Sequence, residues 1–349
     1  MRGKHSFMKG ISSILYFAIG FLILQGGISC KSDLNTDRIN TSTSTNDPKT
    51  SPKVANAPLD TTNPDALYRE AGKYFNNKQY GLAELYLKKA MKLKPNEPDY
   101  FMAMADLYMD QNNSRKAIDI LEQGVNVAPR DTLIRLKQIQ FLIITQQYAD
   151  GIQKSADLLA MDPQNADAYF LRGLIFKETD NDSLARINFQ HAVDLDPQLS
   201  DAYINLGDLY SKDNDPLALK YYQNALAFDD KNPIAKHSIA YYYQNHNQID
   251  KAIELYQDIE KVTPGYPDAY LNLGIIFMTQ DKIPEAYEQF SKFIELDDQA
   301  PEGYYYRSLA AEQLGMPQKA LFDMKEAVSI DPKFEKAQKE LKRLVHKKQ

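Results

Sequence analysis

Eight consecutive segments of this chain can be laid over one another at a spacing of 34 residues. The two that match best are Pro233–Tyr266 and Pro267–Ala300. In both, apolar or small residues fall at places 7, 8 and 11, and again at places 20, 24 and 27, counted from the first residue. Steps of three and four residues define one face of an α-helix. Each unit is therefore predicted to form two helices, A and B, which need each other and the next unit to bury their apolar faces.

The same spacing divides residues 64–334 into units, and only the fifth is one residue short. The units are Pro64–Glu97, Pro98–Asp131, Thr132–Asn165, Ala166–Leu199, Ser200–Asn232, Pro233–Tyr266, Pro267–Ala300 and Pro301–Phe334. The missing residue falls in the turn SKDNDP, where Asp215 can cap helix B and Pro216 can occupy its first turn. The length of the chain alone would suggest two or three domains, but a repeat array grows by adding units.

Small residues recur at the two places where the paired helices are expected to approach each other. Place 20 holds Ala83, Ala117, Gly151, Ala185, Ala218, Ala252, Ala286 and Ala320. Place 8 holds Ala71, Ala105, Ile139, Gly173, Gly207, Ala240, Gly274 and Ser308. The large residue Ile139 and the glycine Gly151 belong to the same unit, which suggests that volume has moved from one helix to the other. We expect this third unit to keep its fold.

The motifs DAYINLGDLY, DAYLNLGIIF, AVDLDP and AVSIDP resemble the tetratricopeptide repeat (TPR), and the resemblance covers Pro64–Phe334. It implies an all-α fold: a right-handed TPR superhelix, or α-solenoid, of about eight helix-turn-helix repeats. The A helices of that family line a concave groove that holds polypeptides. Asp230 and Asp298 depart from the proline usual at place 32. This departure puts the geometry between units in question at those two points, not the fold class.

The first 29 residues are predicted to be a lipoprotein signal peptide. Arg2, Lys4 and Lys9 precede an uncharged apolar stretch of secretory length, and Cys30 follows a small residue. This arrangement resembles a bacterial lipobox, although Gly27 stands where leucine is usual. The alternatives are an uncleaved membrane anchor and a plain cleaved signal. Lys31 is not the aspartate that holds some lipoproteins at the inner membrane, so the expected location is the outer membrane of a bacterial cell envelope.

Two segments flank the repeats. Residues 30–63 are rich in Ser, Thr, Asn and Pro and poor in large apolar residues, which predicts a disordered tether. Residues 335–349, together with the preceding Phe334, carry an apolar stripe of Phe334, Ala337, Leu341, Leu344 and Val345, and the other faces are basic. This stripe predicts a helix that caps the end of the repeat array. The alternative for its basic face is a site for an anionic lipid or a nucleic acid.

Charge and composition exclude several kinds of function. The net charge is −6, and removing residues 1–29, with their three basic and no acidic residues, leaves −9. A chain this acidic is a poor binder of nucleic acid. One cysteine cannot form an internal disulfide, and the five histidines are scattered without metal-ligand spacing. We therefore expect no enzymatic activity, no metal and no cofactor. His237 is expected to be exposed to solvent.

The resemblance places the groove at places 5, 9 and 12 of each helix A, where apolar and aromatic residues predominate. The candidate groove residues are Tyr68, Phe75, Met102, Met109, Leu136, Ile143, Phe170, Leu174, Ile204, Tyr241, Leu271, Met278 and Tyr305. An exposed apolar strip usually marks a binding surface. The alternative is that these side chains pack against the next unit.

The predicted function is a non-enzymatic scaffold, or adaptor, for one or more proteins or peptides, attached to the membrane through Cys30. Two recognition modes of the family lack their residues here. The lysines and asparagines of a carboxylate clamp are missing, and of the asparagines that would hold an extended backbone only Asn205 and Asn272 are present. The expected ligand is therefore an apolar or amphipathic segment. A glycan-binding envelope module is the alternative, since 23 tyrosines could supply stacking surfaces.

Overall fold

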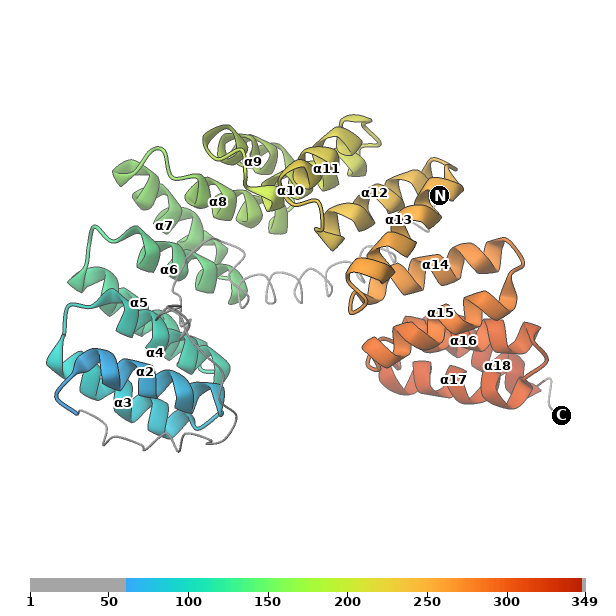
Figure 1. Ribbon diagram of the computed structural model, residues 1–349, viewed down its shortest axis with the longest axis horizontal. Coiled ribbons are helices and arrows are strands. Elements are labelled where there is room, and N and C mark those ends of the chain that lie inside the picture. The colour runs from blue at the N-terminus through green and yellow to red at the C-terminus, as the bar shows by residue number, and fades with distance from the viewer. Residues whose placement is uncertain (1–60, 347–349) are drawn as a thin grey trace, which may run out of the picture. The chain divides into compact units, whose positions relative to one another are not determined.

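The computed structural model describes residues 61–346, and every regular element in this range is an α-helix (Figure 1). The predicted signal peptide, Cys30 and nearly all of the tether lie outside the described residues. The A helices are α2 (Pro64–Asn76), α4 (Pro98–Asp110), α6 (Thr132–Ile144), α8 (Ala166–Glu178), α10 (Ser200–Lys212), α12 (Pro233–Asn245), α14 (Pro267–Thr279) and α16 (Pro301–Gln313). The B helices are α3 (Tyr80–Leu93), α5 (Ser114–Val127), α7 (Tyr148–Met161), α9 (Asp182–Leu195), α11 (Leu217–Phe228), α13 (Ile249–Val262), α15 (Ile283–Leu296) and α17 (Pro317–Ile330), and α18 (Glu335–His346) follows.

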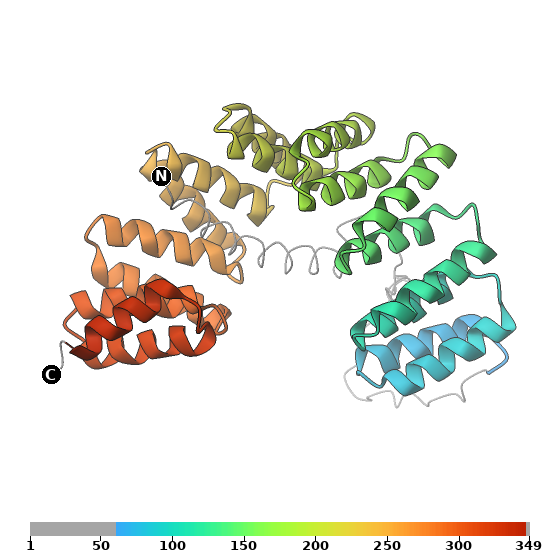
Figure 2. The ribbon, with the colours of Figure 1, turned by 180° about the vertical axis from the view of Figure 1, so that it is seen from behind.

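The all-α fold of paired helices is confirmed. Each helix A begins at the first residue of its repeat unit and packs against its own helix B, as both views show (Figure 1, Figure 2). The described residues divide into two compact halves, with the boundary between Leu195 and Asp196. We call them the N-terminal and the C-terminal half and describe each by itself.

The small residues at place 20 are buried in all eight units, as expected for the point where helix B meets helix A. The glycines at place 8 lie against the large side chain at place 24 of helix B. A Cβ built on Gly207 would come within 2.4 Å of the Tyr222 ring, closer than real Cβ atoms approach. The pairs of this kind are Gly173 with Phe189, Gly207 with Tyr222 and Gly274 with Phe290.

The third unit inverts this pairing. Its place 8 holds Ile139 and its place 24 holds Ser155, and both are completely buried. The predicted compensation between Ile139 and Gly151 is wrong: a Cβ on Gly151 would meet Ile175 at 2.8 Å and Leu142 at 3.8 Å. Gly151 therefore makes room for helix α8 of the next unit, and we infer that Ser155 balances the volume of Ile139.

The turn between helices A and B contains a left-handed residue in every unit, always at place 15. These residues are Lys78, Asn112, Gln146, Asp180, Asn214, Asn247, Asp281 and Gly315. Their φ angles lie between 56° and 72°, a region that glycine enters freely and that asparagine and aspartate tolerate. Lys78 and Gln146 are neither glycine nor asparagine or aspartate. The left-handed backbone therefore costs each of them about 1–2 kcal/mol.

Lys78→Gly and Gln146→Gly should therefore each stabilise the protein. Relief of the left-handed strain outweighs the extra freedom that glycine gives the unfolded chain, leaving a gain of about 0.5–1 kcal/mol. Urea unfolding would measure the gain as a higher midpoint. Gly315→Ala is the reverse control and should lower the midpoint. Equal midpoints for Lys78→Gly and the wild type would show that this turn carries no strain.

The short fifth unit loses its residue where the sequence predicted. The Leu217 backbone N–H donates to Asp215 Oδ1 at 2.9 Å, and Pro216 has helical φ and ψ of −63° and −16°. Asp215 thus accepts from the first N–H of α11, as predicted, but Pro216 is the residue before the helix and not part of its first turn, and α11 is shorter than the other B helices.

Helix α18 covers the end of the C-terminal half. Ala337 and Leu344 are buried against α16 and α17, and Phe334 and Leu341 pack beside them. Val345, which the sequence placed on the same stripe, is 40% exposed. Arg343 donates through Nη1 to Glu312 Oε1 at 2.9 Å and through Nη2 to the other oxygen of this carboxylate. The last groove place of the final repeat, Glu312, is therefore engaged by the cap.

Candidate ligand-binding groove

The structure places none of the thirteen predicted groove residues fully in solvent. In the N-terminal half four are half-buried (Tyr68, Phe75, Met102, Met109) and four are buried (Leu136, Ile143, Phe170, Leu174). In the C-terminal half Ile204 is buried, and Tyr241, Leu271, Met278 and Tyr305 are half-buried. The strip is thus less accessible than the sequence predicted, and eight of its residues keep some exposed surface.

These partly exposed side chains also contribute to the cores of their halves. Met102 and Met109 pack against the cluster around Phe101, and Leu271 and Met278 pack against the cluster around Phe290. The alternative stated above, packing against neighbouring helices, therefore accounts for part of the surface of each of these side chains. A ligand can contact only the part of each side chain that stays exposed.

In the N-terminal half, an ion pair joins the groove faces of neighbouring A helices. Lys137 of α6 lies 2.7 Å from Asp106 Oδ1 of α4, and its Nζ is 5.5 Å from the centre of the Phe141 ring. Burial raises the pKa of Asp106 above its usual value, although Lys137 acts in the opposite direction. The two charges neutralise each other, so this part of the face offers a ligand little net charge.

In the C-terminal half, the main feature is a tyrosine–histidine cluster made of His237, Tyr241, Tyr256, Tyr266 and Asn272. The His237 ring centre lies 5.6 Å from that of Tyr256, 5.7 Å from Tyr266 and 6.4 Å from Tyr241. His237 is half-buried, so the prediction of an exposed histidine is wrong. Burial lowers the pKa of His237, while the carboxylates of Asp268 and Asp208 act to raise it.

The hydrogen bonds of Asn272 fix the protonation state of His237. Asn272 Nδ2 lies 2.9 Å from the backbone oxygen of Asp268 and 2.9 Å from His237 Nε2. A carbonyl oxygen can only accept, so the atom facing it must be the amide nitrogen. The same nitrogen donates to Nε2, which makes Nε2 an acceptor. His237 is therefore neutral and carries its proton on Nδ1.

Tyr222, and Tyr256 of the cluster, donate hydrogen bonds to polar groove residues of this half. Tyr222 donates to Asp208 Oδ1 at 3.0 Å, and Tyr256 donates to Gln244 Oε1 at 3.2 Å. Burial, with the neighbouring acidic groups, raises the pKa of both phenols. Both tyrosines therefore stay protonated donors and hold the groove side chains in place.

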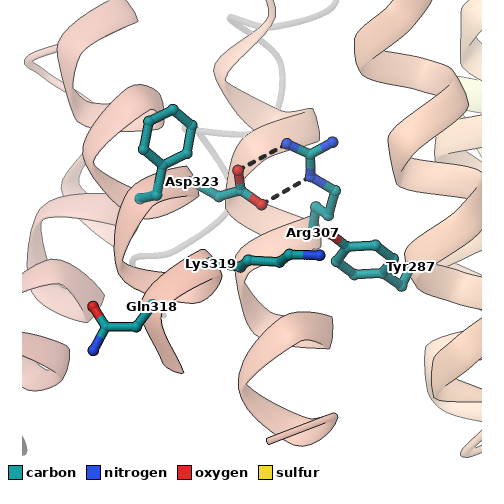
Figure 3. A pocket seen from close by; sticks show the side chains of 6 residues that line it. Tyr287, Arg307, Gln318, Lys319 and Asp323 are labelled. Carbon is teal, nitrogen blue, oxygen red and sulfur yellow. Dashed lines mark hydrogen bonds and ion pairs between the residues drawn. The ribbon is translucent and has the colours of Figure 1, made fainter. Parts of the chain in front are cut away.

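A separate open hollow of about 360 Å³ lies on α15, α16 and α17, lined by Tyr287, Arg307, Gln318, Lys319, Phe322 and Asp323 (Figure 3). Arg307 donates from Nε and Nη2 to the two oxygens of Asp323, each at 2.8 Å. Asp323 is 2% exposed, and its hydrogen bonds raise the pKa of Arg307. The charge of Arg307 is thus already paired, so we assign this hollow a structural role.

A related pair occurs in the N-terminal half. Arg172 Nε donates to Asn188 Oδ1 at 2.6 Å. These two residues stand at places 7 and 23 of their unit, as Arg307 and Asp323 do in theirs. Neither pair is predicted by the repeat pattern, because most units have apolar residues at one or both of these places. The sequence feature that could have indicated such a pair is a polar residue at both place 7 and place 23 of one unit.

Residues 61–346 contain no group of three or more His, Cys, Asp or Glu side chains that could hold a metal ion. Within the same range, each helix is too short or too polar to cross a lipid bilayer.

Sequence models described as tetratricopeptide repeats match residues 74–139, 166–199, 237–301 and 301–334, which together make up more than half of the chain. Anaphase-promoting complex subunit 3 of Schizosaccharomyces pombe is 26% identical over 132 residues, 34% of this chain and 20% of that protein. The type IV pilus assembly protein PilF of Pseudomonas aeruginosa is 26% identical over 138 residues, 39% of this chain and 55% of PilF. The chain thus spans about a fifth of the length of the anaphase-promoting complex subunit and just over half of the length of PilF.

Solved structures share the fold. The Cut9–Hcn1 hetero-tetramer of the anaphase-promoting complex aligns with a TM-score of 0.58 and 17% identity, over 81% of this chain and 56% of that one. A tetratricopeptide repeat protein from Parabacteroides merdae aligns with a TM-score of 0.54 and 14% identity, over 71% of this chain and 98% of that one. With the matches in sequence and the eight helix pairs, these findings show that the chain belongs to the tetratricopeptide repeat family.

Proposed function

We propose that this protein is a lipid-anchored scaffold of a bacterial envelope that binds an apolar or amphipathic polypeptide segment along its A helices. Tetratricopeptide repeat proteins bind other proteins, and their repeat domains are typically non-catalytic. The observation that carries the choice of ligand is the set of eight half-buried apolar and aromatic side chains at the groove places, four in each half. Partly exposed methionines and aromatic rings suit an apolar helix face.

The two asparagines that could hold an extended backbone are already engaged. Asn205 Nδ2 donates to the backbone oxygen of Asp201 at 2.8 Å, and Asn272 binds Asp268 and His237. Asn272 therefore uses both N–H groups of its amide, and Asn205 uses at least one of its two, so these two residues offer little to a ligand's main chain and side-chain contacts have to supply most of the affinity. This supports an amphipathic helix over an extended peptide.

Met102→Gln and Leu271→Gln should each weaken partner binding about tenfold, because each removes roughly 1–2 kcal/mol of apolar contact. Recovery of bound protein in pull-downs from envelope extract would measure the loss. Leu85→Gln is the control, since Leu85 is an exposed apolar residue on a B helix. The proposal fails if both groove variants, folded by circular dichroism, recover as much partner as Leu85→Gln does.

The membrane attachment and the outer-membrane location form a second part of the proposal, supported by the lipobox resemblance around Cys30. The similarity to PilF, a pilus assembly protein, supports a function in the cell envelope. Cys30→Ala should abolish labelling with radioactive fatty acid and move the protein from the membrane fraction to the soluble fraction. Two acyl chains give stable anchoring, so the shift should be nearly complete. An unlabelled wild type would contradict lipidation.

A further inference from the structure

His237 carries one ring proton whose position is fixed by its neighbour. The two hydrogen bonds of the Asn272 amide make His237 Nε2 an acceptor, so the proton lies on Nδ1. Among the described residues, no oxygen or nitrogen accepts a hydrogen bond from Nδ1. His237 is half-buried, and Nδ1 is not one of the completely buried atoms without a partner in that part of the chain. This N–H is therefore a donor that a bound ligand can reach.

The imidazole ring that carries this donor is held on several sides. The Tyr241 ring lies at 9° to it, with 6.4 Å between the ring centres. The rings of Tyr256 and Tyr266 are tilted by 56° and 59°, with their centres 5.6 Å and 5.7 Å away. Tyr256 is completely buried, so one of these contacts comes from the core. A donor fixed by packing and by a hydrogen bond loses little freedom when a ligand binds, which makes it preorganised.

His237 is also unusual for its place in the repeat. Place 5 of the other seven units holds tyrosine, phenylalanine, methionine, leucine or isoleucine. Leu271, which precedes the asparagine that binds His237, is apolar and half-buried at the same place of the next unit. The N–H of His237 is thus a directional polar point on an otherwise apolar line of side chains.

The surroundings of the ring select the kind of acceptor. Water is the ordinary partner of such an N–H, but water adapts to a donor in any position and does not need a fixed proton. The printed neighbours of the ring are three tyrosines and one asparagine, which are uncharged side chains. A carboxylate would lose water there and find no cation among these neighbours, which is costly. A neutral amide oxygen accepts the same hydrogen bond without that cost.

We propose that the Nδ1–H of His237 is a subsite for the side-chain amide oxygen of a glutamine or asparagine in the bound polypeptide. This inference rests on the proposed function, because it names a polar residue beside the apolar face of the amphipathic segment. Asn272 is the positioning residue, since it keeps the proton on Nδ1. A ligand without the acceptor leaves the N–H unpaired, so the subsite sets the register of the ligand, which apolar contacts alone do not.

Nuclear magnetic resonance of the full chain with nitrogen-15 in its histidines tests the donor. The chemical shift of a ring nitrogen shows whether it carries a proton, and His237→Phe identifies the signals of this residue. We expect the proton on Nδ1 at neutral pH in the wild type. In Asn272→Leu the proton should be shared between the two nitrogens. A wild-type proton on Nε2 would overturn the proposal.

Two synthetic amphipathic helices test the ligand. They share one leucine stripe, and the positions beside it carry glutamine in one peptide and methionine, of similar size but only a weak acceptor, in the other. In calorimetric titration of the full chain, His237→Phe should weaken the glutamine peptide about tenfold and change the methionine peptide less than about twofold. Asn272→Leu should weaken the glutamine peptide about threefold. His191→Phe, the same change at an exposed position of α9, should alter neither.

Each result decides between the two levels of the proposal. Equal effects of His237→Phe on both peptides would overturn the subsite and leave the apolar groove standing. Failure of both peptides to bind the wild type would overturn the proposed function as well. A third peptide with glutamate at the same positions should bind more weakly than the glutamine peptide, and tighter binding would overturn the choice of a neutral acceptor. If circular dichroism shows that His237→Phe does not fold, Asn272→Leu gives the decision.

Discussion

Asp323→Ala will lower the free energy of unfolding of the C-terminal half by about 3–5 kcal/mol, the usual cost of leaving one partner of a buried ion pair alone. Asp323 is 2% exposed and holds both hydrogen bonds from Arg307, whose guanidinium lies 5.9 Å from the Tyr287 ring and 5.7 Å from the Tyr304 ring. Without the carboxylate, this arginine is left half-buried without its counter-ion. Urea unfolding followed by circular dichroism measures the loss.

The sixth unit supplies a matched control, because Ile239 and Leu255 occupy the same two places there. The double variant Arg307→Ile with Asp323→Leu copies that pair and should be as stable as the wild type or more stable, since well-packed apolar residues often replace a buried ion pair without loss. A small effect of Asp323→Ala, comparable to that of the exposed Asp250→Ala, would show that the pair contributes little.

Ile139→Ala and Ser155→Phe will each destabilise the third unit, and their combination will restore part of the loss. The first change opens a cavity in a completely buried site and costs about 2–5 kcal/mol. The second adds an aromatic ring to a filled core and costs about 1–3 kcal/mol. The double variant recreates the small-and-large order of the sixth unit, where Ala240 is paired with Tyr256.

A double-mutant cycle on the wild type, the two single variants and the double variant measures the coupling between residues 139 and 155 directly. We expect the double variant to be more stable than the sum of the single effects by more than 1 kcal/mol, as is typical of residues that share one cavity. Ser155→Phe combined with Gly151→Ala is the control, since Gly151 faces Ile175 rather than Ile139. Additive effects of Ile139→Ala and Ser155→Phe would mean that these two side chains do not share a site.

The sequence was sufficient for the features that repeat and insufficient for those that depend on a single unit. The start of each helix A and the small residues at place 20 follow from a period of 34 residues, because helix packing imposes the same size limit in every unit. The left-handed turn at place 15 repeats as well, but Lys78 and Gln146 give no sign of it in the sequence, because only glycine, asparagine and aspartate commonly adopt this conformation.

The candidate site was harder to predict, because its contacts join residues that no period relates. Place 5 was read as a solvent-facing position, yet His237 is enclosed by three tyrosines and bound to Asn272, 35 residues further along the chain. Leu136 and Phe170 were also assigned to the groove surface, and both are buried. Periodicity gives the face of a helix on which a side chain lies, but not what the neighbouring unit places over it.

Site-specific photocrosslinking tests the central claim, that a polypeptide lies along the A helices. Benzoylphenylalanine would replace Met102 and Leu271 at groove places, and Leu85 and Phe322 on the B helices, where Phe322 is 59% exposed. After irradiation of intact cells, the account predicts crosslinks to a polypeptide from both groove positions and none from the two control positions. Crosslinks from Leu85 and Phe322 alone, or the same products from all four positions, would contradict it.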